Sequence, residues 1–171
     1  VGDDKIYGGN DHDYVLGGDG KDSLYGDTGN DTLSGEAGDD LAYGGDGNDT
    51  INLGDGKDKG YGGIGNDSLF GEAGDDSLYG DIGDDTLWGA SGKDLLVGGD
   101  GNDTVLFGLG EGIDSYDGGT GSDTIKILSD PLTGNVGDWL KLTVGSYMKQ
   151  PDGSIVLSPE AAGSITLPDG S

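Results

Sequence analysis

Aspartate is the residue whose type and spacing could do chemistry in this chain. When the sequence is aligned with a period of nine from Gly8, and with a partial unit before it, position six is Asp in all fourteen units. No other ionisable residue recurs in this way. The position-six residues are Asp4, Asp13, Asp22, Asp31, Asp40, Asp49, Asp58, Asp67, Asp76, Asp85, Asp94, Asp103, Asp114 and Asp123.

The other positions of the unit explain how these carboxylates are presented. Positions one and four are almost always Gly, and position eight is usually aliphatic, except at Ala42, Gly60 and Tyr116. We expect positions one to six to form a Gly-rich turn and positions seven to nine a very short strand with position eight turned inward. Such a strand cannot bury its face alone, so the units should stack.

The period therefore predicts an all-β fold, a parallel β-solenoid or β-roll in which two units make one full coil. Units two apart in sequence then stack at strand spacing, about 4.8 Å. This places the Asp residues in two ladders, one from Asp13 to Asp123 and one from Asp4 to Asp114. Stacked carboxylates repel unless a cation lies between them. Ca²⁺ suits such sites because it takes 6–8 oxygen ligands in flexible geometry, whereas Mg²⁺ demands a tighter octahedron.

Composition agrees with a cation as the partner. Asp and Glu number 34 against 8 Lys, the net charge is −26, and only 31% of residues are hydrophobic. A chain of this kind should be disordered until it is neutralised. Its charge excludes nucleic acid and disfavours an anionic membrane surface. There is no Cys and one His, which disfavours zinc or copper. No apolar run predicts membrane insertion.

The units read G-G-x-G-x-D-x-U-x, where U is a large aliphatic residue; residues 44–52 and 98–106 fit in full. Over roughly residues 2–126 the chain resembles the RTX, or hemolysin-type, calcium-binding nonapeptide family. The resemblance implies that each ion lies between two stacked turns. One ion would be held by Gly45, Gly47 and Asp49 with Gly62, Ile64 and Asp67. The next would be held by Gly63, Gly65 and Asp67 with Gly80, Ile82 and Asp85.

Each internal Asp would thus serve two ions. Two stacks of seven turns leave at most six gaps per stack, and we expect roughly 8–11 filled Ca²⁺ sites because ends fray. Sites that touch three irregularities are the weakest candidates: Asp11 at position four, Gly60 in the core, and the two-residue insertion assigned to Phe107-Gly108 with Leu109 after it.

A second column could carry a different function. Tyr7, Tyr25, Tyr43, Tyr61 and Tyr79 stand at position nine of every second unit, which faces outward on the family geometry. The favoured interpretation is a self-stacking ladder that stabilises the sheet. The alternative is a binding surface for a glycan or a protein. Thr and Asn do not form a regular array in the turns, which disfavours ice binding.

Residues 127–171 differ from the repeat and contain all four Pro residues. We expect strands at Trp139–Val144, 155–157 and 164–167, and we interpret 127–171 as a capping flank after a β-roll of residues 1–126. We hypothesise that this flank nucleates folding. The chain opens at Val1 with no signal peptide and stops at a turn without an evident secretion signal, which suggests a fragment.

Three functions remain open. The first is a calcium-driven folding module of a secreted bacterial protein, since the resemblance implies type I secretion and an extracellular or cell-surface location. The second is an adhesive module that uses the Tyr column. The third is an accessory part of a secreted protease, lipase or epimerase with flanking domains. No catalytic arrangement is evident within the chain, so we do not expect this segment itself to be an enzyme.

Overall fold

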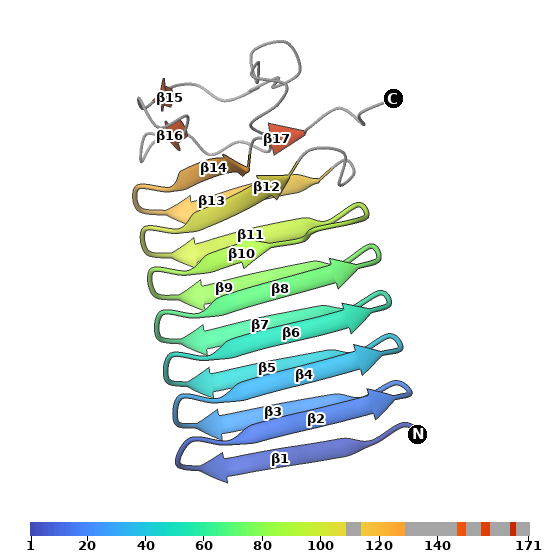
Figure 1. Cartoon of the computed structure of the whole chain (residues 1–171). Helices are drawn as coiled ribbons and strands as arrows, with labels where there is room; N and C mark the ends of the chain where they lie inside the picture. The colour runs from blue at the N-terminus through green and yellow to red at the C-terminus, as the bar shows by residue number, and fades with distance from the viewer. Residues whose placement is uncertain (109–113, 129–146, 150–154, 158–164, 167–171) are drawn as a thin grey trace.

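The computed structural model describes residues 1–108, 114–128, 147–149, 155–157 and 165–166. The chain winds into a parallel β-solenoid in which the odd-numbered and the even-numbered strands of the repeat form two facing sheets (Figure 1). Successive coils stack from the N-terminus at one end towards the C-terminal residues at the other. Within these described ranges there is no helix, and so no helix that could cross a membrane.

Each sheet contains seven parallel strands from the repeat. One holds β1 (Lys5–Asn10), β3 (Ser23–Thr28), β5 (Leu41–Asp46), β7 (Lys59–Ile64), β9 (Ser77–Ile82), β11 (Leu95–Asp100) and β13 (Ser115–Thr120). The other holds β2 (Tyr14–Asp19), β4 (Thr32–Ala37), β6 (Thr50–Asp55), β8 (Ser68–Ala73), β10 (Thr86–Trp88), β12 (Thr104–Gly108) and β14 (Thr124–Leu128). Each strand pairs with the next but one along the chain, as in Leu33↔Ile51, so the predicted solenoid of two units per coil is confirmed.

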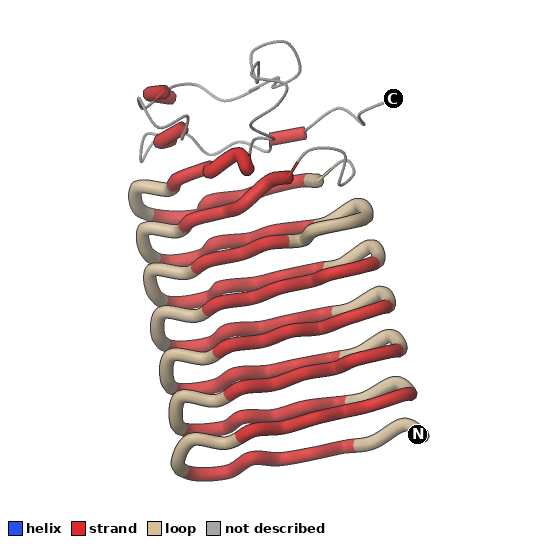
Figure 2. Tube along the Cα trace, viewed as in Figure 1, coloured by secondary structure: helices blue, strands red, loops and turns tan. Residues whose placement is uncertain are grey.

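The strands are longer than the sequence analysis predicted. Most extend from position seven through position three of the next unit, for six residues in all, so only positions four to six form the turn (Figure 2). Position two pairs across the sheet even where φ is positive, as in Gly9↔Asp27. From the sequence we expected positions one to three to belong to the turn, because Gly is a turn residue. Here Gly instead allows close packing within a strand.

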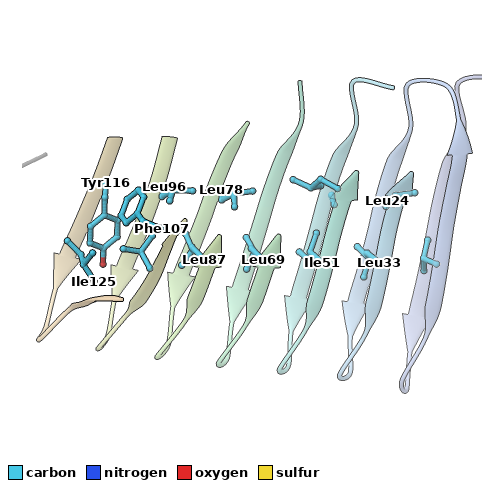
Figure 3. Packing of buried hydrophobic residues seen from close by; sticks show 14 residues of the cluster. Leu24, Leu33, Ile51, Leu69, Leu78, Leu87, Leu96, Phe107, Tyr116 and Ile125 are labelled. Atoms are coloured by element: carbon cyan, nitrogen blue, oxygen red, sulfur yellow. The ribbon is translucent and has the colours of Figure 1, made fainter. Parts of the chain in front are cut away.

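The core is a thin layer of side chains between the two sheets. Position eight provides most of it, and these residues are almost completely buried, as Figure 3 shows for Leu24, Leu33, Ile51, Leu69, Leu78 and their neighbours. Each coil therefore contributes about two apolar side chains, one from each sheet. A core this thin is continuous only because the coils stack.

Two irregularities of the repeat compensate for each other in this core. Gly60 has no side chain at position eight, and Leu53 takes the place of Gly at position one on the opposite sheet. Leu53 is fully buried, and a Cβ placed on Gly60 would lie 3.3 Å from its Cδ1 atom. The Leu53 side chain thus occupies the space that Gly60 leaves. Gly60 removes the core side chain of its own strand, as the sequence indicates, but Leu53 packs beside it in the core.

The insertion near the last coils is also absorbed. Phe107 is buried, pairs with Ile127 across the sheet, and occupies the inward position that position-one Gly takes elsewhere (Figure 3). The spacing between stacked Asp residues then changes from 18, between Asp76 and Asp94, to 20, between Asp94 and Asp114. The extra residues are therefore accommodated after Gly108. The sequence predicted that the two extra residues are Phe107 and Gly108. That prediction was wrong because both residues belong to β12.

Short C-terminal strands pair with the last strand of each sheet. β16 (Ile155–Leu157) is antiparallel to β14 and to β15 (Tyr147–Lys149), and β17 (Ile165–Thr166) is antiparallel to β13. The predicted strand at 155–157 is thus present, and the one predicted at 164–167 is present at Ile165–Thr166. The one predicted at Trp139–Val144 lies outside the described residues. The pairings fit a flank that covers the open edge of both sheets, while the boundary at residue 127 and its role in nucleation stay predictions.

Replacing Leu53→Ala should destabilise the roll by about 2–5 kcal/mol, because the change opens a cavity next to Gly60 that no neighbouring side chain fills. The measurement is urea unfolding at a fixed, saturating calcium concentration. Leu16→Ala is the matched control, since Leu16 is 45% exposed. Equal unfolding midpoints for the two variants would contradict the compensation between Leu53 and Gly60.

Candidate metal centres

The position-six Asp residues line the two edges of the solenoid, at the turns drawn in tan in Figure 2. Twelve of the fourteen are buried, with exposed fractions of 5% or less. Only the first coil differs, because Asp4 is exposed and Asp13 is half-buried. The predicted ladders are therefore present, and their carboxylates lie inside the edges of the molecule away from water.

After the first coil, one oxygen of each position-six carboxylate joins successive coils. The amide of Asp31 donates to Oδ1 of Asp49 at 2.8 Å, and the amide of Asp49 donates to Oδ1 of Asp67 at 2.8 Å. The same bond recurs along both ladders with distances of 2.7–3.1 Å. This role as a hydrogen-bond acceptor between coils was not predicted from the sequence, although the strict spacing of Asp indicates that every unit needs the same contact. Asp at position six is thus a structural acceptor as well as a ligand candidate.

The other oxygen has no donor. Among the described residues, Oδ2 is buried without a hydrogen-bond partner in eleven position-six residues: Asp13, Asp22, Asp31, Asp40, Asp49, Asp58, Asp67, Asp76, Asp85, Asp94 and Asp103. Natural structures rarely bury a polar atom without a partner, and an orphaned carboxylate oxygen is especially costly. Eleven repetitions of the same orphan indicate a ligand that the chain itself does not supply.

Most of these orphaned oxygens face a main-chain oxygen of the following coil. A Cβ placed on Gly44 would collide with Oδ2 of Asp49 and would also lie 2.5 Å from the Gly62 carbonyl oxygen. The side chain of Asp49 and the carbonyl of Gly62 therefore converge on one spot, which Gly44 leaves open because it has no Cβ. The corresponding collision recurs at Gly62, where Asp67 and the Gly80 carbonyl converge.

The remaining predicted carbonyl ligands lie at the same gap between coils. A Cβ on Gly63 would meet the Gly45 carbonyl, and one on Gly65 would meet the Gly47 carbonyl, so both oxygens point to the following coil. The Ile64 carbonyl already accepts a bond from the Gly47 amide at 2.7 Å. The Ile82 carbonyl likewise accepts from the Gly65 amide at 2.8 Å. A carbonyl has two lone pairs, so these two oxygens retain one each.

Glycine at position four is required by this stacking. In the described coils after the first, its φ lies between about +122° and +159°, as at Gly47 with 145°, and a Cβ there would overlap the carbonyl one coil earlier. Asp11 is the exception, with φ of 79° in the first coil. The sequence prediction of a non-Gly residue in a Gly-type turn is confirmed at this position.

Burial and mutual repulsion weaken the acidity of the Asp ladders. Loss of hydration, followed by the charge of neighbouring Asp residues, raises the pKa of Asp58, Asp67 and Asp85 to about 6 from the usual 3.8. The same causes raise the pKa of Asp76, Asp94 and Asp103 to about 7. The amide bond to Oδ1 opposes this effect only in part. The metal-free ladder is therefore electrostatically strained at neutral pH.

The chemistry of the donor set is that of a hard cation. Each gap offers Asp carboxylates and main-chain carbonyls, with no nitrogen or sulfur ligand among the described residues. Within the described part of the chain, no three His, Cys, Asp or Glu side chains come together, so main-chain oxygens must complete any coordination shell. Oxygen ligands of this kind fit Ca²⁺, and the residues present fit the ion that the sequence predicted.

The Tyr column forms a continuous stack on the outer face of the odd-numbered sheet. Successive rings from Tyr7 to Tyr79 have centroids 4.7–5.2 Å apart and planes within 16° of parallel. The Lys5 ammonium lies 5.1 Å from the ring centroids of both Tyr7 and Tyr25. Because neighbouring rings cover each other's faces, the internal rings have no free face for a sugar. This geometry favours the self-stacking interpretation.

The fold and these edges define a class: a parallel β-roll with a ladder of stacked carboxylates along each edge. A family model described as the RTX calcium-binding nonapeptide repeat (4 copies) matches residues 1–24, 25–59, 53–87, 61–96 and 79–113. These matches span well over half of the chain, and the chain belongs to the RTX calcium-binding repeat family. A search of curated proteins gave no match.

The pKa shifts predict how the metal-free chain responds to pH. Because the folded pKa values of Asp76, Asp94 and Asp103 exceed the unfolded value, the folded chain binds more protons between pH 4 and 7. The associated stability is fully present below about pH 4 and is lost as pH rises through about 6–7. In EDTA, circular dichroism should show β-structure at about pH 5 and its loss by about pH 7.5.

Light scattering at each pH is the control for this experiment, because the isoelectric point is about 4.1 and aggregation could imitate folding. A monomeric chain that is disordered at about pH 5 in EDTA, or fully folded at about pH 7.5 in EDTA, would contradict the predicted strain in the ladders.

Proposed function

We propose that this chain binds a stack of Ca²⁺ ions along each edge of the β-roll and that ion binding drives its folding. The observation that carries the proposal is the set of eleven buried Asp oxygens without a donor, most of which face a main-chain carbonyl across the gap between coils. A cation in each gap would satisfy the carboxylate and the carbonyls together, and membership of the calcium-binding family supports Ca²⁺ as that cation.

The proposed ligands are those that the family resemblance implies, and the close approach of their oxygens in the gaps supports them. One ion is held by Asp49 with the Gly45 and Gly47 carbonyls from one coil, and by Asp67 with the Gly62 and Ile64 carbonyls from the next. The following ion repeats this set one coil later, from Gly63, Gly65 and Asp67 to Gly80, Ile82 and Asp85. Six gaps in each stack remain the ceiling, and about 8–11 occupied sites remain the expected number.

Calcium then acts as a condition for folding. The net charge is −26, and about ten Ca²⁺ ions would supply about +20, which relieves most of the repulsion in the compact state. A ligand that binds only the folded state stabilises that state by mass action. A chain of this kind stays disordered where calcium is scarce and folds where calcium is abundant, which is the behaviour of a module in a protein secreted to the cell exterior or surface.

The activity that such a module serves lies outside the repeat. Only a non-catalytic repeat is detected in this chain, and a protease, lipase or epimerase domain would be carried by other parts of a longer protein. The adhesive alternative receives less support, because the Tyr faces that would contact a sugar are used in the internal stack.

Replacing Asp67→Asn should weaken calcium-dependent folding, because this residue is assigned to two ions. We expect the calcium concentration at half-folding to rise by on the order of tenfold or more, since even outer-shell partners of metal sites contribute that much. The measurement is a calcium titration by circular dichroism, with bound ions counted by equilibrium dialysis. Mg²⁺ at the same concentrations should not replace calcium.

Asp84→Asn is the matched control. It removes the same charge one coil later on the same edge, but Asp84 is exposed at position five, where Asn is found in neighbouring coils. Its midpoint should stay within about twofold of the parent chain. Equal shifts in the two variants would show that general charge, and not ligation at position six, controls binding.

A further inference from the structure

The regularity of the ladders creates a problem for folding. Every coil presents the same Asp, nearly the same Gly turns and, through five coils, the same Tyr, each one coil apart. A coil could therefore stack on the coil after next, with the intervening coil looped out, and would still meet a complete set of ligands. Calcium by itself does not distinguish the correct neighbour from that wrong one.

One column of residues does distinguish them. At position five along the edge that carries the Asp4-to-Asp114 ladder, the residues alternate in charge from coil to coil. This charged column consists of Asp3, Lys21, Asp39, Lys57, Asp75 and Lys93. Its pattern repeats only every second coil, which is twice the period of the other columns.

The charged column is connected by direct contacts. Lys21 Nζ bonds to Oδ2 of Asp39, and Lys57 Nζ bonds to Oδ2 of Asp75 at 2.7 Å. The other carboxylate oxygen accepts from the main chain of the next coil: the Lys57 amide donates to Asp39 Oδ1 at 3.1 Å, and the Lys93 amide donates to Asp75 Oδ1 at 3.2 Å. Asp39 thus bonds to the coil before it and to the coil after it.

The opposite edge shows what position five does without alternation. There the Asn48 amide donates to Asn30 Oδ1 at 2.8 Å, and the Asn66 amide donates to Asn48 Oδ1 at 2.7 Å. Asp84 continues the same pattern between Asn66 and Asn102. Side chains of nearly one type link every coil to the next, so a skipped coil would find an equivalent partner. This edge stabilises stacking but does not specify which coil stacks.

We propose that the charged column specifies register: it favours stacking on the adjacent coil and penalises stacking on the coil after next. In the native order every neighbouring pair is opposite in charge. Skipping one coil places Lys21 on Lys57, or Asp39 on Asp75, at strand spacing of about 4.8 Å, and like charges directly opposite each other destabilise a sheet. Each exposed pair contributes little, but the preference applies at each step along the column from Asp3 to Lys93.

The test exchanges two charges without changing composition. Asp39→Lys with Lys57→Asp keeps the net charge but places like charges on two neighbouring pairs, 21 with 39 and 57 with 75. Skipping the coil of β6 now brings position 39 to Asp75 with opposite charge. The matched control is Asp39→Asn with Lys57→Asn, which removes the preference in both directions. Neither position is a proposed calcium ligand.

Register is read by disulfide trapping, because the natural chain has no Cys. Ser34→Cys with Asn52→Cys reports the native pair of β4 and β6, and Ser34→Cys with Phe70→Cys reports a skipped coil. Each pair is oxidised immediately after calcium is added to the unfolded chain. Circular dichroism at saturating calcium shows separately whether each variant folds, so a failure of calcium binding is distinguishable from a failure of register.

We expect the skipped-coil crosslink to rise about two- to fivefold in the charge-exchanged chain over the parent, with the Asn control between them. About 0.5 M NaCl should reduce the difference, since the column is exposed. The proposal is overturned if the charge-exchanged chain folds with calcium and gives the same skipped-coil yield as the parent.

Discussion

Repulsion between buried carboxylates is the constraint on which this structure depends. Twelve Asp side chains are almost excluded from water and are stacked one coil apart, and loss of hydration raises the pKa of several of them to about 6 or 7. The ion pairs of Lys21 and Lys57 go to Asp residues at position five and leave the ladders without that compensation. At neutral pH the metal-free ladders are therefore electrostatically unfavourable, and a Gly at position four, and at position one of most units, leaves room beside the carboxylates.

The apolar core also depends on the stacking of the coils. Each coil buries about two side chains between sheets that lie back to back, which is too little to stabilise an isolated unit. The core tolerates irregular units because side chains reach across it: Leu53 occupies the space beside Gly60, and Phe107 fills the inward position near Tyr116 (Figure 3). The ligand-bearing turns stay in register while the packing between them varies.

The two edges and two faces of the roll have separate roles. Position six joins coils through amide-to-carboxylate bonds and directs a second oxygen at the proposed ions. Position five links coils again, with amides on one edge and alternating charges on the other. The Tyr stack adds a third link on the odd-numbered sheet. A thin solenoid is thus connected at several points per coil, and the charged column differs from the rest in distinguishing one coil from the next.

Sequence alone determined the period, the parallel coil of two units, the inward position eight and the two Asp ladders, because a strict nine-residue repeat allows few ways to stack. It did not determine the length of the strands, because Gly at position one is typical of a turn. Only the close approach of the following coil shows why Gly is found there within a strand. It also could not show that Leu53 replaces the missing side chain of Gly60, or that Asp39 bonds to coils on both sides. These contacts join residues that are distant along the chain, and only the folded coil brings them together.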